Sequence, residues 1–73
     1  MNIAITADKG CSTYWHVRAN ERLVGDIANY SGIWKFGWHW MKQDFYNADQ
    51  LAEITLAANR QVYLLNLTRR LLA

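Results

Sequence analysis

The sequence predicts an α+β fold, in which an antiparallel three- to four-stranded meander sheet is followed by a C-terminal helix or helix pair packed on one face. Apolar and polar residues alternate with strand periodicity up to Lys42, whereas from Asn47 onward the apolar residues recur at helical spacing. The links between the strand-like runs are too short for parallel crossovers. Because nothing resembles a linker or an internal repeat, residues 1–73 are expected to form a single small domain.

Three short runs account for the first strands. Ile3 and Ile5 alternate with smaller or polar residues. In the run "STYWHVRA" one side of the strand is apolar and the other polar; the apolar side carries Thr13, Trp15, Val17 and Ala19, and the polar side Tyr14, His16 and Arg18. A turn at "ANER" leads to the weaker strand "LVGDIANY", where Gly25 indicates a bulge or a close backbone approach.

The fourth run, "IWKFGWHWMK", raises the question of whether its aromatic row binds a ligand or forms part of the core. Strand spacing puts Trp34, Phe36, Trp38 and Trp40 on one side, and Lys35, Gly37, His39 and Met41 on the other. Large aromatic residues at this spacing usually pack inward, so we expect the row to be covered by the C-terminal helical segment.

The C-terminal third begins with a helix capping box made by Asn47 and Gln50. One apolar stripe then comprises Leu51, Ile54, Ala58, Val62 and Leu65, and a second stripe on the opposite side comprises Leu56, Tyr63, Leu64, Leu67 and Leu71. Residues 47–73 are compatible with one helix, with two helices divided at residues 57–61, or with a helix followed by a strand. A break would rotate the second stripe onto the core.

The sequence gives little support to catalysis, metal binding or membrane insertion. Cys11 and His16 are close in sequence, but Cys11 is at the mouth of a tight turn with no cluster of positive charge beyond Lys9 to activate its thiol, and no spacing among Cys11, His16, His39 and Asp44 resembles a zinc motif. We therefore expect no enzyme, no cofactor and no metal. The sole cysteine excludes an internal disulfide, and no long apolar segment or targeting signal is present. These features predict a cytoplasmic protein with no membrane association.

Protein–protein interaction is the leading functional prediction, because the chain is 52% hydrophobic yet too small to bury everything it carries. Without catalytic machinery, it is similar in kind to the small inhibitors that bacteriophages and mobile elements encode against host complexes. We expect an inhibitor or regulator that binds a larger protein assembly. The predicted partner-binding residues are Tyr14, His16, Arg18, Arg22, Tyr30, Lys35 and His39, and Tyr46 is expected to be exposed as well.

Two further expectations concern the partner. A homodimer is predicted through the second helical stripe, using Tyr63, Leu64, Leu67 and Leu71. The alternative function is a small nucleic-acid-binding protein, in which the aromatic and basic sheet face stacks bases and neutralises phosphates. Its candidate residues are Tyr14, His16, Arg18, Lys35 and His39. A net charge of only +2 argues against this alternative without excluding it.

Overall fold

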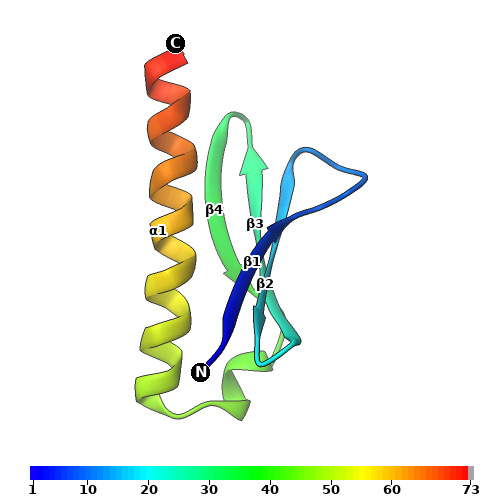
Figure 1. Cartoon of the computed structure of the whole chain (residues 1–73), viewed down its shortest axis with the longest axis vertical. Helices are drawn as coiled ribbons and strands as arrows, with labels where there is room; N and C mark the ends of the chain where they lie inside the picture. The colour runs from blue at the N-terminus through cyan, green and yellow to red at the C-terminus, as the bar shows by residue number, and fades with distance from the viewer. Residues whose placement is uncertain (73) are drawn as a thin grey trace.

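The computed structural model describes the backbone of residues 1–72 and the side chains of residues 1–68. Its elements are, in chain order, the strands β1 (Ile3–Ala7), β2 (Tyr14–Ala19), β3 (Arg22–Tyr30) and β4 (Ile33–Trp38), the short 3₁₀ helix η1 (Lys42–Phe45) and the helix α1 (Ala48–Leu72). The strands form one antiparallel sheet in the order β1-β2-β3-β4, and α1 runs beside it (Figure 1). The predicted α+β meander is therefore confirmed, with four strands and one helix.

Two tight turns impose the meander topology. Asn20 and Glu21 join β2 to β3 with φ angles of 49° and 72°, and Ser31 and Gly32 join β3 to β4 with φ angles of 54° and 90°. Two-residue loops with positive φ at both positions match the natural twist of a hairpin. β3 and β4 consequently each fold back on the strand before them, whereas a longer loop, residues 8–13, joins β1 to β2.

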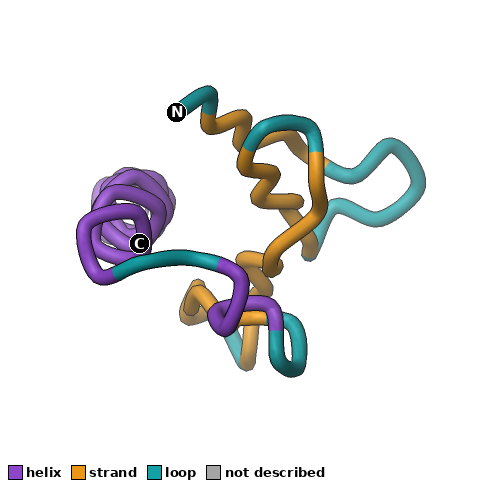
Figure 2. The backbone as a smooth tube through the Cα atoms, turned by 90° about the horizontal axis from the view of Figure 1, so that it is seen from below, coloured by secondary structure: helices purple, strands orange, loops and turns teal. Residues whose placement is uncertain are grey.

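The core lies between α1 and one face of the sheet. The view from below shows α1 lying to one side of the strands (Figure 2). Val17, Val24, Ile27, Ile54 and Ala58 are at most 1% exposed, and partly buried aromatic side chains close around them. These side chains include Trp15, Trp34, Phe36 and Trp38. The prediction that the aromatic row lines the core is thus confirmed for residues 34, 36 and 38.

Trp40 is an exception, because its side chain is 88% exposed. β4 ends at Trp38, and the last sheet-like contact is the His39 N–H donating to the Val24 carbonyl at 2.9 Å. The chain then turns, with Met41 in the left-handed region at φ 62°, so strand alternation no longer sets the direction of the Trp40 side chain. The expectation for Tyr46 is wrong in the opposite sense, since Tyr46 packs against the core.

The C-terminal segment is one unbroken helix from Ala48 to Leu72, so the predictions of two helices or of a helix plus a strand are wrong. Residues 57–61 contain neither glycine nor proline that would interrupt it. The capping box is confirmed: the Asn47 N–H donates to Gln50 Oε1 at 3.0 Å, and the Gln50 N–H donates to Asn47 Oδ1 at 2.8 Å. The second stripe therefore stays on the far side of α1 from the core.

Candidate partner-binding face

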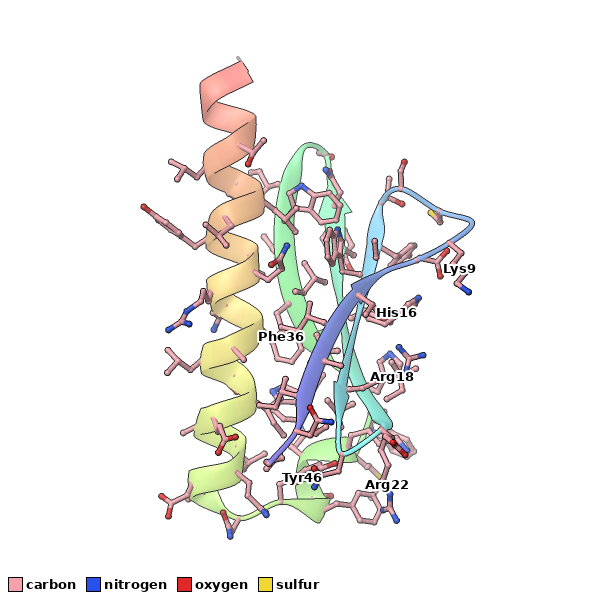
Figure 3. All side chains as sticks on the ribbon, in the orientation of Figure 1. Lys9, His16, Arg18, Arg22, Phe36 and Tyr46 are labelled. Atoms are coloured by element: carbon pink, nitrogen blue, oxygen red, sulfur yellow. The ribbon has the colours of Figure 1, made fainter. Side chains whose placement is uncertain are left out.

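The side of the sheet turned away from α1 is uncovered, and we call it the open face. Strand alternation places on it Tyr14, His16 and Arg18 of β2, Asp26, Ala28 and Tyr30 of β3, and Ile33 and Lys35 of β4. His16 and Arg18 project away from the helix, whereas Phe36 projects toward it (Figure 3). The face therefore mixes charged and aromatic side chains on one side of the sheet.

A linear network of alternating carboxylates and imidazoles crosses the open face. His16 Nε2 lies 2.6 Å from Asp8 Oδ1, and His16 Nδ1 lies 2.8 Å from Asp26 Oδ1. The other oxygen of Asp26 lies 2.7 Å from Nε2 of His39. The network forms because His16 and Asp26 are directly opposite each other in the β2–β3 register, while Asp8 follows β1 and His39 follows β4. One chain of hydrogen bonds thus links all four strands.

The geometry of the network defines its charge. Both ring nitrogens of His16 face carboxylate oxygens, so both must donate, which requires the charged imidazolium. The hydrogen bonds with Asp8 and then Asp26 accordingly raise the pKa of His16. The hydrogen bond from His16, aided by the Gly10 N–H, lowers the pKa of Asp8. Burial pushes the pKa of Asp26 upward, but the hydrogen bonds from His39 and His16 together outweigh burial and leave it lowered.

The network holds segments together and is not arranged as a metal cage. Neither nitrogen of His16 is free to act as a base, and its carboxylates are already occupied by N–H donors. Across residues 1–68, no group of three or more His, Cys, Asp or Glu side chains is placed to bind a metal ion. Cys11 Sγ lies 2.9 Å from Thr13 Oγ1 in the loop between β1 and β2. Through Asp8 and His39, the network therefore fixes the β1–β2 loop and the segment that follows β4 to the sheet.

The other end of the open face is apolar and exposed. Tyr14, Tyr30 and Ile33, which we call the tyrosine patch, are 43%, 61% and 46% exposed. Ala28 lies between Tyr14 and Lys35 in the register and is only 4% exposed. The small side chain of Ala28 is therefore covered by the longer side chains around it.

The structure thus brings six of the seven predicted partner-binding residues to one face. The exception is Arg22, which lies in register with the core residue Ala19 at the end of the sheet. Sequence reasoning missed Asp8 and Asp26, which hold the two histidines. Of the predicted dimer residues, Tyr63 and Leu64 are 63% and 48% exposed, Leu67 is half-buried, and the side chain of Leu71 lies outside the described residues.

Comparison with protein-family models, with curated proteins and with solved structures finds no match to this chain. Within the described part of the chain, no helix has both the length and the apolar composition needed to cross a bilayer. Functional inference therefore depends on the geometry of the surfaces.

Proposed function

We propose that this protein is a non-catalytic interaction module, of the inhibitor or regulator type, that binds a larger protein assembly through the open face. The observation that supports this function is the exposure of the tyrosine patch on an uncovered sheet face that also carries Arg18 and Lys35. Tyrosine and arginine are the side chains that most often dominate protein interfaces. The chain has just one cysteine, Cys11, which supports the cytoplasm as its compartment.

The charges of the open face favour a protein partner over a nucleic acid. Asp8 and Asp26 place two carboxylates on this surface, one on each side of the single imidazolium of His16. A phosphate backbone crossing this face would meet negative charge where binding requires cations. A protein partner, in contrast, can present carboxylates to Arg18 and Lys35 and an apolar side chain to the tyrosine patch.

The network also makes the face suitable for recognition without a large change of shape. His16 and His39 are both held through Asp26, so the polar half of the face is already ordered before a partner arrives. A rigid surface loses less conformational entropy on association. The partner is therefore expected to bind a preformed platform.

The test begins with the immobilised protein as bait in an extract of its natural host. The partner retained by the wild type is purified, and its affinity is measured by calorimetry against Tyr14→Ser/Tyr30→Ser. We expect the double variant to bind about 30-fold more weakly, corresponding to the loss of one strong interface contact. Phe45→Ser is the matched control, since Phe45 is 69% exposed but lies in η1. Equal affinity of wild type and double variant would contradict the assignment of the face.

The nucleic-acid alternative is tested separately with fluorescently labelled single-stranded DNA and RNA of mixed sequence. We expect no change of anisotropy even at low salt. Binding that weakens steeply with added salt, and that disappears in Arg18→Gln/Lys35→Gln, would instead support the alternative.

A further inference from the structure

The side of α1 that faces away from the sheet carries a heptad pattern. Its residues, which we call the outer seam, follow one another in steps of four and three: Asp49, Glu53, Leu56, Arg60, Tyr63 and Leu67. This spacing is that of the contact positions in a coiled coil. Leu56 and Tyr63 are 67% and 63% exposed, although residues buried in the core occupy the same helix on its other side. The seam is thus regular, and its exposed apolar residues Leu56 and Tyr63 stand on either side of the charged Arg60.

We propose that a second copy of this chain docks on the outer seam with its helix antiparallel. In the register that we infer, Leu56 faces Leu67 of the second copy and Arg60 faces Tyr63 of the second copy. Two-fold symmetry repeats each contact. The two Arg60–Tyr63 pairs, in which a guanidinium stacks on a phenol ring, thus lie at the centre, and a leucine pair lies on each side of them. This inference concerns a different surface from the open face, so it stands or falls independently of the proposed function.

The charges of the seam select the antiparallel orientation. Asp49 and Glu53 lie in the first two turns of α1 and Arg60 at its midpoint. A parallel pair would bring each of these residues against its own copy, placing like charges face to face. Glu53 also lies 3.8 Å from the Met1 amino group, whereas Arg60 forms no ion pair with any described side chain. Among the described side chains, Arg60 therefore still has no acidic partner for its charge.

The apolar residues of the seam select the register. Shifting the second helix to the neighbouring heptad alignment would put Leu56 against Arg60 and Glu53 against Tyr63, so no leucine would meet a leucine. In the proposed register the leucines meet and Arg60 covers an aromatic ring. The sheet lies on the opposite side of α1, and the C-terminal end of the helix projects past the β3–β4 turn, so the second helix has free access (Figure 1).

Mass measurement by light scattering over a concentration series gives the first test. A seam of this length buries less than the standard interface of about 1,600 Å², so the mass is expected to rise with concentration toward twice the 8.5 kDa of one chain. Leu56→Asp should weaken dimerisation at least about tenfold, whereas Phe45→Asp, at a site of equal exposure outside the seam, should leave it unchanged. A wild type that stays at 8.5 kDa throughout would overturn the proposal.

Disulfide trapping tests the orientation, in a Cys11→Ser background that removes the native thiol. Mixing Leu56→Cys with Leu67→Cys should give a disulfide-linked dimer, whereas Leu56→Cys alone should not, because disulfides require Cα atoms within about 7 Å. Circular dichroism confirms that each variant keeps its helix. Self-crosslinking of Leu56→Cys would show a parallel pair or a different register, and absence of the mixed product from a dimeric protein would likewise overturn the proposed register.

Discussion

The side-chain amide of Asn66 completes both backbone hydrogen bonds of Trp34. Asn66 Oδ1 accepts from the Trp34 N–H at 2.9 Å, and Asn66 Nδ2 donates to the Trp34 carbonyl at 3.1 Å. β4 is an edge strand, so at this residue the amide takes the place that a fifth strand would occupy. The contact fastens α1 to the sheet and protects part of an exposed strand edge from pairing with another chain.

Replacing Asn66 with alanine should therefore reduce both stability and solubility. Losing the two hydrogen bonds and exposing the edge of β4 is expected to lower the free energy of unfolding by about 2 kcal/mol. Urea denaturation monitored by tryptophan fluorescence measures the change. Asn59→Ala is the control, since Asn59 is exposed on the same helix. Equal stability of the two variants would show that the amide contact contributes nothing.

A second prediction concerns Gly25, whose missing side chain makes room for the neighbouring strand. A Cβ at this position would lie 2.5 Å from the Gly37 carbonyl oxygen and 2.8 Å from Phe36 Cε1. Gly25→Ala must therefore displace backbone and is expected to cost about 1–3 kcal/mol. Gly37→Ala on β4 is the matched control, because a Cβ there meets nothing within 4 Å. Comparable urea midpoints for both variants would contradict this packing.

The tryptophans at positions 38 and 40 provide a third test, because they are only two residues apart but one packs against the core and the other is exposed. Trp38 packs edge-on against Phe36, with ring centroids 5.5 Å apart, whereas Trp40 is 88% exposed. We expect Trp38→Ala to cost about 3 kcal/mol and in so small a domain to cause substantial unfolding, visible by circular dichroism. Trp40→Ala should leave the melting temperature nearly unchanged. A well-folded Trp38→Ala would mean that the two faces of β4 are wrongly assigned.

The network on the open face predicts a maximum of stability at mildly acidic pH. The pKa of His16 is raised on folding, so its contribution is complete below its unfolded pKa of about 6.5 and is lost as the pH rises through the higher folded pKa. The pKa values of Asp8 and Asp26 are lowered, so their contribution is present above about 3.9 and is lost as the pH falls through the folded values. The network therefore stabilises most between these limits.

Urea midpoints measured over a pH series check this prediction. Stability should decrease from mildly acidic to mildly basic pH in the wild type, and His16→Gln should flatten that decrease because the imidazolium of His16 is no longer there to lose its proton. Lys35→Gln, a charge change outside the network, should keep the wild-type profile. Identical profiles for the wild type and His16→Gln would show that His16 is not charged within the network.

Strand alternation and helical spacing were sufficient to predict most of the fold. The short turns predicted the meander, and the capping box at Asn47 and Gln50 marked the helix start to within one residue of Ala48. Trp40 was misplaced because alternation holds only while a strand continues, and no proline or glycine follows Trp38 to indicate its end. The sequence did not decide between one helix and two, because alanine, asparagine and arginine at residues 57–60 are compatible with either a turn or a helix.

The carboxylates of the open face escaped prediction for a geometric reason. Counting back from the Asn20–Glu21 turn without interruption places His16 opposite Gly25 and turns Asp26 toward the core. The register shifts by one residue at the bulge between Val17 and Arg18, and only this shift brings Asp26 opposite His16. Gly25 indicated that a bulge was possible, but its position in the register depends on packing against Phe36 and Gly37.

The strands lie in the sheet in the same order as in the chain, and this order affects how the protein folds during synthesis on the ribosome. Each strand meets its neighbour as soon as it is made, so the sheet can assemble hairpin by hairpin from local contacts. Its apolar side, however, stays uncovered until α1 leaves the exit tunnel, because Ile54 and Ala58 belong to α1. A nascent chain stalled before α1 emerges would present Trp34 and Trp38 to chaperones, and docking of α1 would cover them.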